Sequence, residues 1–397
     1  MADRPWLTIL GLGEDGPEGL PPASRAALEA ADCVIGPARH LALLPDLSAH
    51  RIEWPVPFAE GLPLILARRG TPTVALASGD PFWFGAGRVL AEALEPGEWR
   101  ALPGPSTFSL AAARLGWGLE RTTCLGLHAA PLTRLRPHLA PGARILALLR
   151  DGAAVDAVAE LLCELGFGES SLTLCEALGG PRERVLQVRA CDWTGGASHP
   201  VAVGLEIAGQ GTVMTCASGR EDALFASDGQ MTKRPVRALA LSALAPRPGE
   251  RLWDIGGGSG SIAIEWLLAH HTTQATSIEP RPARAANIRA NATALGVDRL
   301  QVVEGTAPEA LMELPAPEVV FIGGGLSRAL LDALTEQAPG ARLVAHAVTL
   351  ESEALLADWQ ATQGGELLRI ELAEARPLGS RRGWAAAYPV VQYRGRL

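Results

Sequence analysis

One short stretch, an apolar segment followed by alternating glycines, constrains the fold of this chain more than any other feature. Residues 252–255 have the composition of a buried strand, and the next five residues read Gly-Gly-Gly-Ser-Gly. Glycine permits a sharp turn and lets a ligand approach the backbone closely. An amphipathic helix follows at 261–268, and its first N–H groups have no partner within the helix. Strand, glycine turn and helix in this order predict a ligand site at the turn.

The spacing of the glycines differs from that of a dinucleotide-binding turn. Such a turn has the pattern Gly-x-Gly-x-x-Gly, whereas here Asp254 precedes glycines at 256, 258 and 260. The next predicted strand, 275–278, is followed by Glu279, an acid well placed to accept hydrogen bonds from ribose hydroxyls. A glycine turn in some other doubly wound sheet is the alternative.

The turn and the acid together resemble the class I S-adenosylmethionine (SAM)-dependent methyltransferases, which have a doubly wound, Rossmann-like α/β fold. The resemblance implies that SAM lies on the glycine turn, with Glu279 at its ribose and the loop after the following strand beside its adenine. It also implies that a threonine ahead of the turn faces SAM. The implied SAM-binding residues are Thr232, Asp254, Gly256, Gly257, Gly258, Ser259, Gly260, Glu279, Thr306 and Ala307.

The first half of the chain alternates strands and helices, and several strands end in loops of Gly, Pro, Ser and Asp. A strand at 6–10 leads into a glycine loop at 11–19, a strand at 73–77 leads into Ser-Gly-Asp-Pro at 78–81, and a third loop at 102–107 reads Leu-Pro-Gly-Pro-Ser-Thr. This alternation predicts a parallel α/β sheet with ligands at the carboxyl ends of its strands. For any one loop, a turn or a helix N-cap is the alternative.

The three loops taken together resemble the tetrapyrrole methylase family. In that family SAM lies in a cleft between two α/β lobes, so the resemblance implies a second lobe at about 121–203 of this chain. The SAM-binding residues that the matches imply are Gly13, Gly79, Asp80, Ser106 and Thr107.

Two domains joined by a linker are the organisation that we expect for the 397 residues. We place a two-lobed tetrapyrrole methylase domain at 1–205, a linker at 206–226 and a class I methyltransferase domain at 227–397. Within the last domain, Asp-Gly-Gln-Met-Thr-Lys-Arg at 228–234 and Ala-Val-Thr-Leu-Glu at 347–351 extend the resemblance to the family of decarboxylating precorrin-6Y C5,15-methyltransferases of cobalamin biosynthesis.

That resemblance implies a specific reaction. The first domain would methylate a precorrin-6-type tetrapyrrole at C5. The second would methylate it at C15 and remove the ring C acetate carboxyl as CO2, which gives a precorrin-8-type product. Methyl transfer to a nucleophilic macrocycle carbon mainly requires alignment and exclusion of water, so the lack of an evident catalytic triad is compatible with it.

Charge and cysteine usage limit the partners and the compartment. The formal net charge of −8 argues against a broad nucleic-acid footprint, although a local group of arginines can still hold an anionic small molecule. No apolar run is long enough to span a bilayer, and the first residues lack the basic start of a signal peptide. The six cysteines are scattered and form no zinc pattern. We therefore expect a cytoplasmic enzyme without metal, nucleic-acid or membrane partners, and we also expect a homo-oligomer.

Lysine usage singles out one position. Of the 35 basic residues, Lys233 is the only lysine, and it precedes the helix that leads to the glycine turn. An ammonium differs from a guanidinium in size, donor geometry and hydration, so this lysine is a candidate with a special role at the mouth of the site. Lys233, Arg234, Arg381 and Arg382 are candidates to hold substrate carboxylates, and His346 is a candidate proton donor. Solvated surface charges and a satisfied core histidine are the alternatives.

Three other functions remain alternatives on sequence grounds. They are an RNA methyltransferase, a nicotinamide oxidoreductase and a tetrapyrrole carrier without activity. The acidic balance disfavours the first, the glycine spacing disfavours the second, and the third would need no second nucleotide-type site. Mass spectrometry of ligands retained on purification distinguishes all of them.

Overall fold

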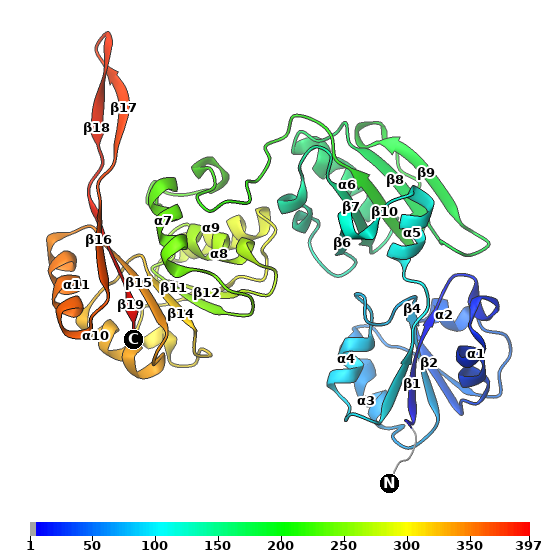
Figure 1. The fold of residues 1–397 in the computed structure, drawn as a ribbon. Coiled ribbons are helices and arrows are strands. Elements are labelled where there is room, and N and C mark those ends of the chain that lie inside the picture. Colours follow the sequence, from blue (N-terminus) through cyan, green and yellow to red (C-terminus); the bar gives the residue numbers. More distant parts are fainter. Residues whose placement is uncertain (1–4) are drawn as a thin grey trace. The chain divides into compact units, whose positions relative to one another are not determined.

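The computed structural model describes residues 5–397, which divide into two units (Figure 1). Residues 1–4, part of the segment on which the signal-peptide expectation rests, lie outside the described range. The first unit consists of the chain up to Leu132 together with His138–Thr212, and the second of Thr133–Pro137 together with Val213–Leu397. Both are α/β folds, so the predicted fold class is confirmed. Across residues 5–397, no helix has the length and apolar character required to cross a membrane.

The first lobe of the first unit is a five-stranded parallel sheet with the order β3-β2-β4-β1-β5. β1 is buried along its whole length because it lies inside the sheet with apolar side chains on both faces. Since β4, β1 and β5 are neighbours, their carboxyl ends bring the three predicted ligand loops to one edge. The elements are β1 Leu7–Leu12, α1 Pro22–Glu29, β2 Cys33–Gly36, α2 Ala38–Ala42, β3 His50–Glu53, α3 Gly61–Leu66, β4 Thr73–Ser78, α4 Gly87–Glu92 and β5 Trp99–Leu102.

The second lobe is a five-stranded mixed sheet with the order β6-β7-β10-β8-β9. β6 and β7 pair in parallel, whereas β7 with β10, β10 with β8, and β8 with β9 are antiparallel. Helix α5 begins after Ser106, whose hydroxyl accepts a hydrogen bond from the Ser109 N–H at 3.1 Å, so this serine is an N-cap. The elements are α5 Thr107–Leu115, β6 Thr123–Gly126, β7 Arg144–Leu149, α6 Gly152–Glu164, β8 Ser171–Glu176, β9 Arg184–Arg189 and β10 Val201–Glu206.

The second unit is a seven-stranded doubly wound sheet with the order β13-β12-β11-β14-β15-β19-β16. It is parallel from β13 to β15, and β19 pairs antiparallel with both β15 and β16. Helices α7–α9 pack on one face and α10 and α11 on the other. The elements are α7 Arg234–Leu244, β11 Arg251–Ile255, α8 Ser261–Ala269, β12 Gln274–Glu279, α9 Pro282–Ala294, β13 Gln301–Glu304, β14 Val319–Ile322, α10 Arg328–Gln337, β15 Arg342–Ala347, α11 Leu350–Gln363, β16 Glu366–Ile370 and β19 Val390–Arg396.

The strand order of the second unit places a ligand site. After β11 the chain adds β12 and β13 on one side, and then crosses over to add β14 and β15 on the other. Ligands of open α/β sheets bind outside the carboxyl ends of the strands at such a reversal. The glycine turn follows β11 directly and therefore lies at this position.

Much of the stretch assigned to a linker packs on the second unit. Met214 and Phe225 belong to its apolar core, and Arg220 is 5% exposed. The boundaries of the two domains and the linker at 206–226 remain predictions. In the structure, residues 213–226 belong to the second unit.

A long hairpin extends from the second unit between β16 and β19, drawn in red in Figure 1. Its strands are β17 Ala373–Leu378 and β18 Arg381–Ala386, and every residue of β17 is exposed. Four strands follow α11, namely β16, β17, β18 and β19. The hairpin leaves only a weak signal in the sequence, because Ala-Glu-Ala-Arg at 373–376 alternates apolar and polar residues over just four positions and β18 does not alternate.

Candidate active sites

A pocket of about 780 Å³ lies at the carboxyl ends of β11, β12 and β14. It is bounded by the glycine turn, the loop after β14, the segment 230–233 and the base of the β17–β18 hairpin. The sequence-predicted residues that line it are Thr232, Lys233, Asp254, Gly256, Gly257, Gly258, Ser259, Glu279, Thr306, Ala307 and His346.

The glycine turn leaves no room for side chains at its start. Gly256 has φ +74°, and a Cβ there would lie 2.7 Å from the backbone nitrogen of Gly324. A Cβ on Gly257 would lie 2.0 Å from the hydroxyl of Ser277. At Gly258, by contrast, a Cβ would meet nothing closer than 3.5 Å. The turn therefore presents bare backbone to the pocket, the cradle that a closely approaching ligand requires.

Two acids lie beneath and beside this turn. Asp254 is 1% exposed, and burial raises its pKa to about 7, with the nearby Glu279 carboxylate adding to the rise. The Ser277 hydroxyl opposes this by donating to Asp254 Oδ2 at 3.3 Å. Glu279 Oε2 accepts the N–H of Gly258 at 2.9 Å and Oε1 that of Arg281 at 3.1 Å. Burial thus favours the protonated form of Asp254, and a cationic ligand nearby favours its charged form.

A polar group in the turn lacks a partner. The Ser259 hydroxyl is buried and makes no hydrogen bond within residues 5–397. The Ser259 carbonyl accepts a hydrogen bond from the Asn291 side chain at 2.9 Å. The Asn291 side chain also donates to the carbonyl of Ala226 and accepts from its N–H. Asn291 thereby ties the glycine turn to the segment that leads to residues 230–233.

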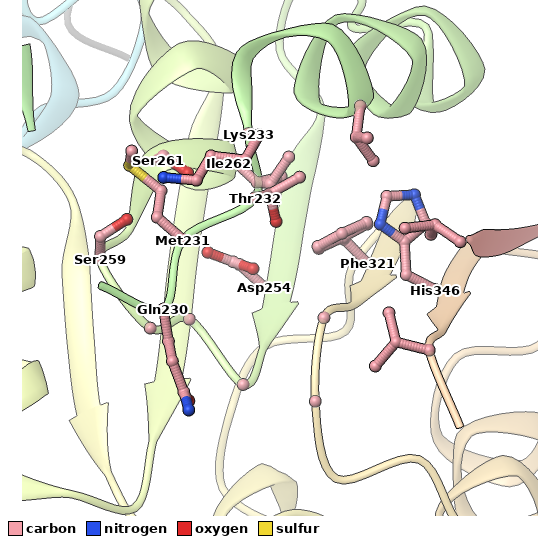
Figure 2. A pocket seen from close by; sticks show the side chains of 18 of the residues that line it. Gln230, Met231, Thr232, Lys233, Asp254, Ser259, Ser261, Ile262, Phe321 and His346 are labelled. Carbon is pink, nitrogen blue, oxygen red and sulfur yellow. The ribbon is translucent and has the colours of Figure 1, made fainter. Parts of the chain in front are cut away.

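The segment 230–233 covers one side of the pocket. Figure 2 shows Met231, Thr232 and Lys233 above Asp254, with Phe321 and His346 to the right of these residues. Lys233 is the N-cap residue of α7, its side chain is 62% exposed, and its ammonium lies 3.9 Å from the Asp222 carboxylate. It is therefore accessible at the edge of the pocket.

A buried ion pair that the sequence analysis missed holds this segment in place. Arg237 and Glu265 are both fully buried, and Arg237 Nε donates to Glu265 Oε1 at 2.6 Å. The guanidinium also donates to Asp222 Oδ1 at 3.0 Å and to the carbonyl oxygens of Thr232 and Arg220. The available signal was an acid, Glu265, inside an otherwise apolar helix, since buried acids require partners.

His346 comes from the carboxyl end of β15. Its Nε2 lies 3.0 Å from Oε1 of Gln392, and its ring meets the Phe321 ring edge-on with centroids 5.0 Å apart. Burial lowers the pKa of His346, and the hydrogen bond to Gln392 opposes this. The imidazole is therefore neutral at neutral pH.

The structure does not bring four candidates to the pocket lining. Gly260 has φ +75°, and a Cβ there would lie 2.7 Å from Ile288 Cγ2, so its role is in packing. Arg234 pairs with Glu221. Arg381 and Arg382 lie on the exposed strand β18, while Arg376, on the other strand of the hairpin, does line the pocket.

The first unit has a second pocket, of about 600 Å³. Its three loops are in close backbone contact, since a Cβ on Gly11 would lie 1.8 Å from the Gly79 carbonyl oxygen and one on Gly79 2.6 Å from that of Pro105. Asp80 Oδ1 accepts the Phe82 N–H at 2.9 Å, a local turn bond. All five residues predicted for this half line the pocket: Gly13, Gly79, Asp80, Ser106 and Thr107.

A polar group in this pocket was not anticipated. Arg39 pairs with Glu14 and donates to the Ser78 hydroxyl at 3.0 Å, and that hydroxyl lies 3.2 Å from His40 Nε2. Burial, together with the charges of Arg39 and His199, lowers the pKa of His40 to about 3. The group joins β1, α2 and β4, so no single stretch of sequence reveals it.

Comparison with known proteins gives matches to both units. Residues 7–192 match the family described as Tetrapyrrole (Corrin/Porphyrin) Methylases, and residues 223–396 match the family described as Precorrin methyltransferase domain. The chain is 51% identical to the precorrin-6Y C(5,15)-methyltransferase (decarboxylating) of Sinorhizobium sp over 98% of this chain and 96% of that protein.

A shorter protein and a solved domain each match part of the chain. The probable cobalt-precorrin-6B C(15)-methyltransferase (decarboxylating) of Pyrobaculum aerophilum is 36% identical over 40% of this chain and 85% of its own length. The crystal structure of the C-terminal domain of precorrin-6Y C5,15-methyltransferase from Rhodobacter capsulatus is 54% identical, with a TM-score of 0.45, over 46% of this chain and 100% of that one.

Proposed function

Because the chain belongs to the family of decarboxylating precorrin-6Y C(5,15)-methyltransferases, we propose that each unit uses SAM to methylate one precorrin macrocycle. The first unit acts at C5, and the second acts at C15 and decarboxylates the ring C acetate. The observation that carries this proposal is that each unit has its own glycine-lined pocket at the carboxyl ends of parallel strands.

The pocket of the second unit fits SAM. When bound, SAM supplies the methyl group from its positively charged sulfonium. Gly256–Gly258 offer bare backbone, Glu279 offers a carboxylate to ribose hydroxyls, and the buried Ser259 hydroxyl offers an unused donor. The carboxylates of Asp254 and Glu279 complement a cationic ligand, while Thr306 and Ala307 border the far side of the pocket.

The pocket of the first unit fits SAM by the same criterion. Its loops allow only glycine at positions 11 and 79, which again leaves backbone exposed to a ligand. Gly13, Gly79, Asp80, Ser106 and Thr107 are the residues we assign to SAM there. Arg39 lines the same pocket but is paired with Glu14, so we give it only a supporting role toward a carboxylate of the macrocycle.

In the second unit, binding of the macrocycle requires cations near the mouth of the pocket. Lys233 and Arg376 line the pocket and can hold carboxylates of the substrate. Arg234 is paired with Glu221 outside the lining, so we give it a supporting role only. Phe321, Val348 and Tyr388 supply apolar surface that excludes water from the reacting carbons.

Decarboxylation requires an electron sink and a dry carboxylate. The conjugated macrocycle is the sink, and the protein's part is to orient the acetate C–C bond and then to supply a proton to the carbon that loses CO2. His346 is the group in the pocket that we assign to this proton transfer.

The remaining features concern partners and compartment. We propose a small-molecule tetrapyrrole as the substrate and no nucleic-acid partner, in keeping with the net charge of −8. The six free cysteines support a reducing compartment such as the cytoplasm. The open edges of the β17–β18 hairpin, with Leu378 and Trp384 71% and 80% exposed, support a homo-oligomer.

A matched pair of full-length variants tests which unit performs which methylation. Gly79→Ala and Gly256→Ala each place a Cβ against backbone at a positive φ, one in each pocket. With SAM and a precorrin-6-type substrate, we expect Gly256→Ala to lose C15 methylation and CO2 release while retaining C5 methylation. Gly79→Ala should lose C5 methylation alone. Mass spectrometry of the products reads both, and CO2 release from folded Gly256→Ala at the wild-type rate would contradict the assignment.

A further inference from the structure

We propose that Gln392 is a positioning residue that keeps the Nδ1 atom of His346 free to accept a proton from the macrocycle and to return it. The proposal rests on the proposed function, because it concerns the proton transfers that accompany C15 methylation and decarboxylation. It adds to that function a residue on the last strand of the sheet and a reason why one site performs both reactions.

The geometry defines which nitrogen is free. His346 and Gln392 are directly opposite in the antiparallel pair of β15 and β19, so their side chains project from the same face. Gln392 is 5% exposed, and its amide oxygen accepts from His346 Nε2–H at 3.0 Å. The proton is therefore on Nε2, and Nδ1 carries a lone pair. No hydrogen bond to Nδ1 comes from residues 5–397, while His346 lines the pocket.

The surroundings leave the imidazole without a neutralising charge. Its two direct partners, the Gln392 amide and the Phe321 ring, are uncharged. The charged groups that line the same pocket are Lys233 before α7, Asp254 on β11, Glu279 on β12, Arg281 before α9, Arg284 on α9, and Glu374 and Arg376 on β17. Burial lowers the pKa of His346. An imidazolium formed here therefore gives its proton back more readily than one in water.

The two reactions balance in protons. Transfer of CH3+ to C15–H gives a cationic macrocycle, which becomes neutral when the C15–H bond breaks, its electron pair returns to the ring and the proton leaves. Loss of CO2 from the acetate leaves the C–C electron pair on the exocyclic carbon, which takes up one proton to become a methyl group. One neutral imidazole that accepts at Nδ1 in the first step and donates from Nδ1 in the second returns to its starting state.

Nitrogen NMR of the ligand-free full-length protein tests the structural half of the proposal. The protein is labelled with 15N at its histidines, and the signal that is absent from His346→Gln is assigned to His346. We expect the wild-type protein to show the Nε2–H tautomer at neutral pH. Gln392→Glu, which is almost isosteric, places a carboxylate on Nε2–H and should raise the pKa of His346 by at least one unit. A matched control is Gln363→Glu, which adds the same charge at an exposed position at the end of α11. An Nδ1–H tautomer in the wild type would overturn the proposal.

The pH dependence of the reactions tests the mechanistic half. C15 methylation requires neutral His346, so its rate should fall at low pH. In Gln392→Glu this fall in rate should begin at a higher pH, displaced by the pKa shift that NMR measures for His346. In Gln363→Glu it should begin at the wild-type pH. C5 methylation by the first unit should not move in either variant. If the pKa of His346 is shifted in Gln392→Glu but the pH dependence of C15 methylation is unchanged, the proposal is wrong. A wild-type protein that neither methylates C15 nor releases CO2 at any pH would instead refute the proposed function.

Discussion

At the scale of single residues, Asp254 couples the stability of the second unit to pH. Its carboxyl is buried under the glycine turn, and its pKa is raised from 3.8 to about 7. Between these values the unfolded chain binds fewer protons than the folded one, so stability falls as pH rises from about 4 to about 7. The penalty is on the order of a few kcal/mol.

Asp254→Asn removes this penalty without changing the shape of the side chain. In the ligand-free protein, we expect the melting temperature of the variant relative to wild type to increase steadily from pH 4 to pH 7 and then to level off. Thermal unfolding at a series of pH values measures this difference. A difference that is constant with pH would show that Asp254 is ionised in the folded protein throughout.

Lys233 is a second residue whose chemistry can be separated from its charge. It is exposed at the edge of the pocket and shares its surroundings with Asp222. Arginine keeps the charge but is larger and planar. We expect Lys233→Arg to bind SAM with nearly unchanged affinity by calorimetry and to lose at least tenfold in C15 methylation or decarboxylation. Wild-type rates for both reactions would show that the single lysine has no special role.

At the scale of elements, the Arg237–Glu265 pair joins α7 to α8 and holds the segment 230–233 over the pocket. Removal of Arg237 leaves the buried Glu265 carboxylate with Arg220, at 3.5 Å, as its remaining cation, and breaking a buried pair in this way costs up to about 3–5 kcal/mol. We therefore expect Arg237→Met to lower the free energy of unfolding of the second unit by that amount, and SAM binding to weaken because the Thr232 carbonyl loses its donor.

Arg328→Met is the matched control for this change. Arg328 pairs with Asp332 on α10 and with Asp358 on α11, and all three side chains are at least 55% exposed. Such exposed pairs contribute at most about 1 kcal/mol each. Denaturant unfolding compares the two variants. Equal losses of stability would mean that burial of the Arg237 pair adds nothing.

The same elements show where sequence reasoning succeeds and fails. The glycine turn after β11 and the loops after β1, β4 and β5 were predictable because each is a local pattern at the end of an apolar strand. Arg237 and Glu265 are 28 residues apart, and His346 and Gln392 are 46 apart. Contacts of this kind depend on which strands and helices become neighbours, which local periodicity does not specify. The exposed β17–β18 hairpin offered only the short alternation at 373–376.

At the scale of the whole molecule, the chain should separate into two ligand-binding parts. Gln210 and Thr212 are exposed between β10 and the buried residues that begin at Met214. We expect a protease of broad specificity, used on the folded full-length protein, to cut within 209–218, and each fragment to bind SAM. Trypsin should not cut after the buried Arg220 until the second unit unfolds. Retention of SAM by one fragment alone would mean that the other pocket has been misassigned.

The position of Lys233 also makes the protein unusually simple to label. Reagents that acylate amines have one side chain to react with in the entire chain, and it is exposed beside the pocket of the second unit. The α-amino group of the chain also reacts with such reagents, and peptide mapping distinguishes the two products. A dye on Lys233 would report on whatever enters that pocket, without any engineered cysteine. For the same reason, an endoproteinase that cuts only after lysine has a single cleavage site, and occupation of the pocket should slow that one cut.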